Sequence, residues 1–259
     1  MRILVTGGAG YVGSIVAKQL LAAGHDVTVL DDLSRGHAGA IPEGAAHAQV
    51  SLTDADAVRQ TLGDGYDAVL HFAALALVAE SVSHPERYWH VNVGGTRNLL
   101  DAMREAGTKR LVFSSTCATY GEPETVPIRE NEPTAPVNSY GASKLAVDLM
   151  IRDECTAHDL AAASLRYFNV AGASGELGED HEPETHLIPL ILQAAAGVRD
   201  HIKVFGTDYP TRDGTAVRDY IHVEDLGAAH LLALDAIQPG EHRIYNLGTG
   251  TGYLSLIHI

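Results

Sequence analysis

The chain has 259 residues, which suits one large α/β domain or one domain with a smaller lobe. Hydrophobic residues make up 46% of it and charged residues 20%, as in globular proteins with a sizeable core. The formal charge of −15 argues against nucleic-acid binding, because phosphates would be repelled. A small anionic ligand stays possible, since it needs only a local group of arginines and backbone N–H groups.

Cysteine content and hydropathy narrow the class further. The two cysteines, Cys117 and Cys155, form no short-spaced pair, so we expect a reducing, cytoplasmic setting without disulfides or a zinc site. The chain opens with MRILVTGG, which we interpret as a strand rather than a signal peptide. Apolar runs are too short to span a bilayer, so no membrane association is expected.

Short β-branched runs alternate with longer segments of helical period up to residue 169. Strands are expected at 2–6, 26–31, 46–50, 67–74, 109–115 and 164–169. Helices are expected at 11–24, 53–63 (with Thr53 as N-cap), 80–106 and 139–158. Apolar strands separated by amphipathic helices indicate a parallel sheet covered on both faces. The predicted fold class is therefore α/β, with a doubly wound, Rossmann-like parallel sheet.

The alternation of strand-like and helix-like segments ends after Asn169. Residues 171–185 are rich in glycine and acidic residues and are expected to form a loop, as are residues 206–219. Helices are expected at 186–197 and 223–237, and strands at 201–205 and 243–249. This part is predicted to be a smaller lobe interwoven with the main sheet.

A glycine-rich loop, TGGAGYVG (6–13), lies between the first strand and the first helix. Glycines let the backbone approach a pyrophosphate, which then meets the N-terminal end of the helix dipole. A plain glycine-rich turn is the alternative. Asp31 ends the second strand, where its carboxylate would accept hydrogen bonds from an adenosine ribose and repel a 2′-phosphate, so NAD is favoured over NADP. Arg35 nearby would favour NADP, but we give the carboxylate more weight.

Tyr140 and Lys144 lie one helical turn apart in NSYGASK (138–144), downstream of Thr116 at the end of a strand. Residues four apart share a helix face, so the lysine is placed to stabilise a tyrosine phenolate. The alternative is a surface tyrosine beside a solvated lysine. The spacing by itself does not decide between them.

Several longer motifs carry a family resemblance. Together with the glycine loop, FSSTCATYG (113–121) and YGASK, the stretches HFAA (71–74), NVGGT (92–96), SLRYFNVAGA (164–173), DYPTRDGTAVRDYIHVEDL (208–226) and IYNLG (244–248) are similar to the UDP-glucose 4-epimerases, members of the extended short-chain dehydrogenase/reductase family. The match runs from residue 1 to about residue 252. The segment 208–226 is far more specific than a glycine loop.

The resemblance implies an enzyme that inverts C4 of a UDP-hexose, interconverting UDP-galactose and UDP-glucose. Hydride would pass transiently to tightly bound NAD, and a 4-keto sugar would turn over in the site. Tyr140 would remove the proton from the 4-hydroxyl, and Lys144 would lower the pKa of Tyr140 and bind the nicotinamide ribose. Thr116 would hydrogen-bond the sugar oxygen.

The resemblance also assigns binding residues. Those expected at the cofactor are Gly7, Gly10, Tyr11, Val12, Gly13, Asp31, Ser51, Leu52, Phe72, Ala73, Ala74, Asn92, Ser114, Tyr140, Lys144 and Tyr167. Those expected at the substrate are Thr116, Tyr140, Asn169, His186 and Arg218. Arg218 could instead pair with Asp219 or Asp213, and His186 could be a helix-end residue without a role. We expect no metal site at His181 and His186, because acidic loops usually hold such histidines in solvent.

The sequence departs from the family in three places that matter. Ala76 and Leu77 stand where some members have a lysine near the pyrophosphate. Ser51 stands where an aspartate commonly holds the adenine amine, so adenine affinity is expected to fall somewhat. The atypical tail 253–259 follows IYNLGTGTG, where the family continues; we therefore expect an incomplete substrate lobe and a poorly active or inactive chain. The NAD-binding domain is assigned to 1–170, with 216–249 returning to it, and part of the substrate lobe to 171–215. The resemblance suggests a homodimer through helices 80–106 and 139–158.

Three other functions stay open. A related NAD-dependent epimerase acting on UDP-N-acetylhexosamine, pentose or uronic-acid sugars would differ in pocket volume. A 4,6-dehydratase is disfavoured, because that group has an Asp-Glu pair after the threonine, where this chain has Cys117 and Ala118. An inactive NAD-binding remnant or regulator usually loses the tyrosine or the lysine, and this chain has both.

Overall fold

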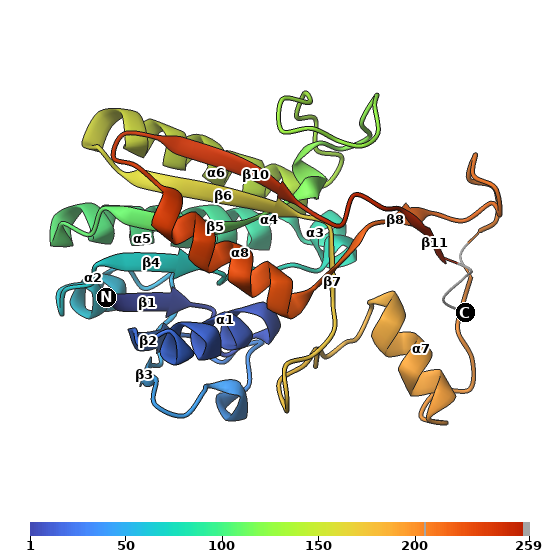
Figure 1. Cartoon of the computed structure of the whole chain (residues 1–259), viewed down its shortest axis with the longest axis horizontal. Coiled ribbons are helices and arrows are strands. Elements are labelled where there is room, and N and C mark those ends of the chain that lie inside the picture. Colours follow the sequence, from blue (N-terminus) through green and yellow to red (C-terminus); the bar gives the residue numbers. More distant parts are fainter. Residues whose placement is uncertain (205, 256–259) are drawn as a thin grey trace.

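A seven-stranded parallel sheet forms the centre of the computed structural model, which describes residues 1–204 and 206–255 (Figure 1). The strand order is β10-β6-β5-β4-β1-β2-β3. Its strands are β1 (Arg2–Thr6), β2 (Asp26–Leu30), β3 (Ala46–Ala48), β4 (Ala68–His71), β5 (Arg110–Thr116), β6 (Ala161–Tyr167) and β10 (His242–Leu247). The order reverses direction between β1 and β4, the feature of doubly wound folds that places ligands at the carboxyl ends of these strands.

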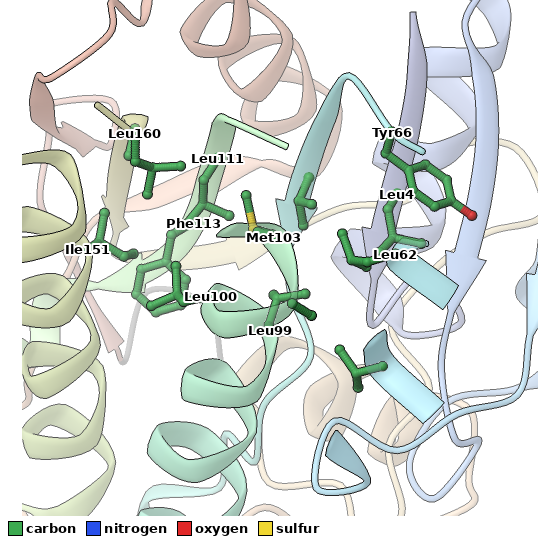
Figure 2. Close-up of a cluster of buried hydrophobic side chains, with 14 of the residues drawn as sticks. Leu4, Leu62, Tyr66, Leu99, Leu100, Met103, Leu111, Phe113, Ile151 and Leu160 are labelled. Atoms are coloured by element: carbon green, nitrogen blue, oxygen red, sulfur yellow. The ribbon is translucent and has the colours of Figure 1, made fainter. Parts of the chain in front are cut away.

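Helices cover both faces of the sheet, as the apolar strand sequences require. One core cluster lies under α1 (Tyr11–Ala22) and α8 (Val223–Ala236), and the other under α2 (Ala55–Leu62), α5 (Gly95–Ala106) and α6 (Ser139–His158). Successive strand residues serve opposite clusters: Leu111 and Phe113 enter the one in Figure 2, and Val112 enters the other. These observations confirm the predicted fold class.

The outer part of the chain stands at the carboxyl ends of the strands. There α7 (Leu187–Ala195) lies apart from the main sheet and contains no buried residue (Figure 1). Two short ladders join distant segments: β7 (Asn169–Ala171) with β9 (Tyr220–His222), and β8 (Val217–Arg218) with β11 (Tyr253–Leu254). Of the tail, Ser255 bonds the Ala216 carbonyl and residues 256–259 lie outside the described residues.

Three local predictions need correction. The helix expected over 80–106 is four elements: α3 (Val78–Ser83), α4 (Pro85–Tyr88), a π-helical segment (Trp89–Gly94) and α5. The break falls at His84, which precedes Pro85 and has the non-helical angles φ −133° and ψ 60°, as steric conflict with a following proline requires. The strand expected at 201–205 is absent from residues 201–204, while Phe205 lies outside the described residues.

The third correction concerns the start of α2. Its N-cap is Asp54, whose carboxylate accepts a hydrogen bond from the Ala57 amide, and not Thr53. The Thr53 hydroxyl instead lies 3.0 Å from the Ser51 hydroxyl.

None of the helices within 1–204 and 206–255 has both the length and the hydropathy that a bilayer span demands.

Candidate active site

One large cavity of about 1770 Å³ opens at the carboxyl ends of β1 and β4, where the strand order reverses. It brings together all the residues predicted for cofactor or substrate, from both parts of the chain, except Asn92. The predicted residues that line it are Gly7, Gly10, Tyr11, Val12, Gly13, Asp31, Ser51, Leu52, Phe72, Ala73, Ala74, Ser114, Thr116, Tyr140, Lys144, Tyr167, Asn169, His186 and Arg218.

The glycine loop forms a tight backbone cradle at the start of α1. A Cβ on Gly7, whose φ is +71°, would lie 2.5 Å from the Ala73 amide nitrogen, and one on Gly13 would lie 2.2 Å from the Gly7 carbonyl oxygen. Side chains at these two positions would therefore fill the space between the loop, β4 and the helix. Since α1 begins at Tyr11, its N-terminal amides face the same cavity, and the arrangement fits a pyrophosphate.

The carboxylate at the end of β2 braces this loop. Asp31 accepts hydrogen bonds from the amides of Ala9 (3.0 Å) and Leu33 (2.9 Å), and its side chain lines the cavity. Arg35, which would favour a 2′-phosphate, is engaged elsewhere. Its guanidinium donates to the Glu182 carbonyl at 3.0 Å and to the Glu80 carboxylate at 3.3 Å. This geometry fits an unphosphorylated adenosine ribose better than a 2′-phosphate.

Tyr140 and Lys144 project from the first turns of α6 toward the end of β5. Asn138 caps the helix by accepting from the Gly141 amide at 2.8 Å, which fixes where the first turn begins. Burial raises the pKa of Tyr140 to about 12, and a hydrogen bond with the Thr116 side chain opposes that rise. Thr116 is thus a polar neighbour of the phenol.

Lys144 is buried, and its ammonium group has a fixed position. Its Nζ donates to the Ser114 carbonyl at 2.8 Å and lies 4.8 Å from the centre of the Phe113 ring. Burial lowers the pKa of Lys144 to about 7, and the Asp148 carboxylate opposes the shift. The bond to Ser114 fixes the ammonium group at the end of β5, and the hydrogen bonds recorded for the described residues include none between Lys144 and Tyr140.

A buried ion pair that the sequence analysis missed lies behind Lys144. Asp148 accepts from Arg166 at 2.8 Å and 3.1 Å, both side chains being less than 5% exposed, and from the Ser115 hydroxyl at 3.2 Å. A signal was present in the sequence, because Asp148 follows Lys144 by four residues and so shares its helix face. The pair fixes α6 against β5 and β6.

Asn92 needs correction, because it lies behind the cavity wall. It is 2% exposed and belongs to the π-helical segment. Its side chain accepts from the Leu75 amide (2.8 Å) and donates to the Leu75 carbonyl (3.0 Å) and to the Ser143 hydroxyl (3.0 Å). Ser143 in turn donates to the Tyr140 carbonyl at 2.8 Å. Asn92 therefore positions the wall and the helix that carries Tyr140.

Asn92 ends a buried polar chain that begins at the glycine loop. His71 lies between the hydroxyls of Thr6 (2.7 Å) and Thr96 (2.8 Å), and the Thr96 hydroxyl donates to the Asn92 carbonyl. Because Thr96 donates its proton onward, His71 donates through Nε2 and accepts through Nδ1. Burial, with the nearby Lys144 charge, lowers the pKa of His71 to about 3, so its ring is neutral. The chain thus couples the strand before the loop to the catalytic helix.

Asn169 and Arg218 stand on the opposite wall. The Asn169 amide donates to the Asp219 carbonyl at 3.0 Å, and Arg218 donates to the Val217 carbonyl at 3.0 Å. The alternative ion pair of Arg218 is wrong: Asp219 accepts from Thr249 and Gly250, and Asp213 from Thr215. Within the described ranges no salt bridge involves Arg218, whose positive charge therefore faces the cavity.

His186 precedes the first turn of α7 and also lines the cavity. Its Nδ1 lies 2.7 Å from Glu179 and 2.9 Å from Glu184. The hydrogen bond with Glu179 raises the pKa of His186 to about 9, while the pKa of Glu179 falls to about 2. The side chain is thus half-exposed but not without partners, and these partners are carboxylates of the same loop.

Comparison with known proteins places the chain among sugar-nucleotide enzymes. A family model described as "NAD dependent epimerase/dehydratase family" matches residues 3–248. The UDP-glucose 4-epimerase of Corynebacterium glutamicum is 56% identical over 98% of this chain and 77% of its own length, and that of Streptomyces lividans is 57% identical over 97% and 77%.

Solved structures extend this likeness to the fold. The Brucella ovis UDP-glucose 4-epimerase in complex with NAD superposes with a TM-score of 0.94 at 46% identity, over 99% of this chain and 80% of that one. The Bifidobacterium longum enzyme in complex with NAD⁺ and UDP gives 0.94 at 36% identity, over 99% and 80%.

Proposed function

Because the chain belongs to the NAD-dependent epimerase/dehydratase family, we propose that it inverts C4 of a UDP-hexose, interconverting UDP-galactose and UDP-glucose. One observation carries the proposal: a single cavity joins a dinucleotide loop to Tyr140, Thr116 and Lys144. Relatives of high identity with this activity support it, as do related structures that hold NAD and UDP.

The cofactor is NAD, which when bound would supply the acceptor and donor for a hydride at C4. The glycine loop would bind its pyrophosphate through backbone amides at the start of α1. Asp31 would accept hydrogen bonds from the adenosine ribose, and Ser51 would face the adenine without a charge. Lys144, whose ammonium group also donates to the Ser114 carbonyl, would donate a hydrogen bond to the nicotinamide ribose.

Proton transfer falls to the hydroxyl pair at the end of β5. Tyr140 would take the proton of the sugar 4-hydroxyl and later give it back, with Thr116 holding the same oxygen in place. With a pKa of about 12, almost none of the Tyr140 phenol is ionised near neutral pH, so it needs a neighbouring positive charge that stabilises the phenolate before it can act as a base. Lys144, one turn along α6, is the cation placed to supply that charge.

The diphosphate of the substrate would lie against Arg218 and Asn169. Arg218, like Arg199 and Lys203, lines the cavity without a carboxylate partner among the ion pairs of the described residues, and a guanidinium suits a diphosphate through paired hydrogen bonds. A cavity of about 1770 Å³ leaves room for the sugar ring to turn over once its 4-hydroxyl has been oxidised.

Conversion of UDP-galactose to UDP-glucose, followed by NMR or chromatography, tests this function. Tyr140→Phe should lower the rate by on the order of 10²–10⁴-fold and leave NAD bound, because it removes only the acid/base hydroxyl. Tyr66→Phe is the matched control, since that tyrosine belongs to the core cluster outside the cavity. A near-full rate in Tyr140→Phe would exclude the mechanism.

Cofactor choice has its own test. Calorimetry should find NAD bound much more tightly than NADP, and Asp31→Ala should narrow the difference, because the carboxylate would repel a 2′-phosphate. Equal affinities of the unchanged protein for NAD and NADP would show that Asp31 does not select against the 2′-phosphate.

We also propose that two copies pair through the adjoining helices α3 to α6. Val82, Trp89 and Leu149 support this, because they are large apolar side chains that are 67%, 45% and 44% exposed on these packed elements. Light scattering of Leu149→Glu should report a monomer if the proposal holds.

The free thiols of Cys117 and Cys155 support a reducing, cytoplasmic location.

A further inference from the structure

Four side chains of the loop before α7 converge on one point. Glu179, His181, Glu184 and His186 each present one oxygen or ring nitrogen, and these four atoms all lie within 4.8 Å of one another. The carboxylates of Glu179 and Glu184 are largely buried, at 11% and 7% exposed, although the loop is on the surface. Two glutamates brought into a small volume need nearby positive charge, which either a protonated imidazole of the cluster or a bound metal ion can supply.

The spacing of these atoms fits a tetrahedral metal ion. Bonds of about 2.0–2.2 Å from Zn²⁺ to nitrogen and oxygen put neighbouring ligand atoms about 3.4 Å apart. The His–Glu distances in the cluster are 2.7, 2.9, 3.2 and 3.9 Å, which lie on both sides of that value. Small side-chain rotations would therefore complete a first coordination shell without moving the backbone.

His181 supplies a second observation. Its Nδ1 is buried, and among the described residues no group forms a well-aligned hydrogen bond with it, although a Glu179 oxygen lies 3.2 Å away. The Glu179 contact satisfies this buried nitrogen only in part, and the nitrogen is turned toward the other three ligand atoms. A cation at the centre of the cluster would satisfy it.

The loop is held in place from the cofactor side. Arg35 donates to the Glu182 carbonyl at 3.0 Å, and His37 Nε2 lies 3.1 Å from the Asp180 carbonyl. His186, at the other end of the cluster, directly precedes α7, and α7 has no buried residue to fix its position. An ion in the cluster would therefore join α7 to a loop that the residues after β2 already hold.

We propose that Glu179, His181, Glu184 and His186 bind one divalent transition-metal ion, with Zn²⁺ as the ion best matched to two imidazoles and two carboxylates. The two carboxylates balance its charge, so the site is neutral when filled and the imidazoles are deprotonated. Its role is structural: it fixes α7 and the cavity wall that His186 forms. The proposal departs from the expectation that this loop keeps its histidines in solvent, and it does not depend on the reaction that the cavity carries out.

Metal binding is measured on the full chain after chelator treatment. Zn²⁺ competed against a chromophoric chelator should bind with one equivalent per chain, and Co²⁺ should give the intense visible absorption of a tetrahedral site. His181→Gln and Glu184→Gln should each weaken binding by more than the 10–100-fold that loss of an outer-shell partner costs, because they remove a ligand. His84→Gln is the matched control, since this exposed histidine also faces a glutamate, Glu86, at 3.6 Å.

Two further readouts keep the proposal open to refutation if a variant folds poorly. Zn²⁺ should raise the melting temperature of the unchanged protein and slow proteolysis within 179–186, and both effects should be absent in His181→Gln and present in His84→Gln. Zn²⁺ affinity equal to that of the control variant, or an octahedral Co²⁺ spectrum from the unchanged protein, would overturn the proposal. The cluster would then be a network of imidazolium and carboxylate groups only.

Discussion

The two walls of the cavity are held in different ways. On the cofactor side the polar side chains are buried and bonded to one another: Asn92 and Lys144 are 2% and 3% exposed, and Asp148 pairs with Arg166 beneath them. On the substrate side Arg218 is exposed and its guanidinium donates to the carbonyl of the adjacent Val217, and α7 buries no residue. One wall keeps its geometry through the core, and the other through charge and loop contacts.

This difference indicates which part of the reaction each wall can support. Hydride and proton transfer need groups held within a fraction of an ångström, and buried hydrogen bonds provide that without a ligand. A nucleotide sugar that must turn over between two hydride transfers needs a wall able to yield. We therefore expect substitutions on the cofactor wall to alter stability or cofactor retention, and those on the substrate wall to alter affinity with little change in stability.

The glycine loop gives the largest expected effect. Gly13→Ala should abolish NAD retention and destabilise the chain, because its Cβ would lie 2.2 Å from the Gly7 carbonyl oxygen and 3.0 Å from the Gly8 Cα. Gly39→Ala is the control, since Gly39 lies outside the cavity lining and its Cβ would meet nothing within 4 Å. Bound NAD is measured by its absorbance after release from the purified proteins. Full retention in Gly13→Ala would mean that the loop is less tightly packed than the rest of this wall.

Arg218 tests the other wall. Arg218→Ala should raise the KM for UDP-galactose by roughly 10–150-fold, since a hydrogen bond to a charged group is worth about 1.5–3 kcal/mol. The melting temperature should stay unchanged, because among the described residues the hydrogen bond recorded for this exposed guanidinium goes to the carbonyl of the adjacent Val217. Arg218→Lys should recover part of the affinity by restoring charge without the paired donors. A fall in melting temperature as large as that caused by Gly13→Ala would contradict the comparison.

The buried histidines make the cofactor wall sensitive to acid. Burial lowers the pKa of His71 to about 3 and of His230 to about 4, against about 6.5 in the unfolded chain. Between these values the unfolded state binds protons that the native state does not, so stability should fall as the pH drops below about 6.5. The slope is about 1.4 kcal/mol per pH unit for each histidine.

Urea unfolding at several pH values measures this dependence. In His71→Gln, the free energy of unfolding should fall less steeply between pH 6 and 4, by the contribution of one titrating histidine. This difference should appear whatever the effect of the substitution on stability at pH 7. His201→Gln, at an exposed histidine, is the control. An unchanged slope in His71→Gln would show that the chain from Thr6 to Asn92 accepts a proton without loss of structure.

The sequence predicted well what local chemistry decides. Apolar runs and glycine spacing located the strands of the main sheet and the phosphate loop, and the start of α6 fell at Ser139 as expected. The long helix over 80–106 failed because helical periodicity continued across His84 and Pro85, where the backbone does not. The short ladders that join β7 to β9 and β8 to β11 depend on distant pairing, for which three or fewer residues give no periodic signal.

The sequence predicted the site residues whose position follows from the end of a strand. Residues at strand ends, such as Thr116 and Asp31, line the cavity because parallel strands end at one edge. Asn92 was assigned to the cofactor, but the π-helical segment turns its amide toward Leu75 and Ser143. The convergence of Glu179 with His186 could not be read either, because an irregular loop has no period from which facing residues follow.

The smallest expected effect concerns the start of α2, at the edge of the cofactor side. Asp54→Ala should lower the free energy of unfolding by about 1 kcal/mol, because its carboxylate satisfies the Ala57 amide and faces the positive end of the helix dipole. Thr53→Ala, at the position that the sequence favoured as the cap, should cost less, since Thr53 bonds only the Ser51 hydroxyl. Neither change should reduce NAD retention, because α2 reaches the cavity only through the preceding Ser51 and Leu52. Urea denaturation with parallel measurement of bound NAD tests both expectations. A larger loss of stability for Thr53→Ala than for Asp54→Ala would assign the cap to the threonine. A loss of NAD in Asp54→Ala would show that α2 also supports the cofactor side of the cavity.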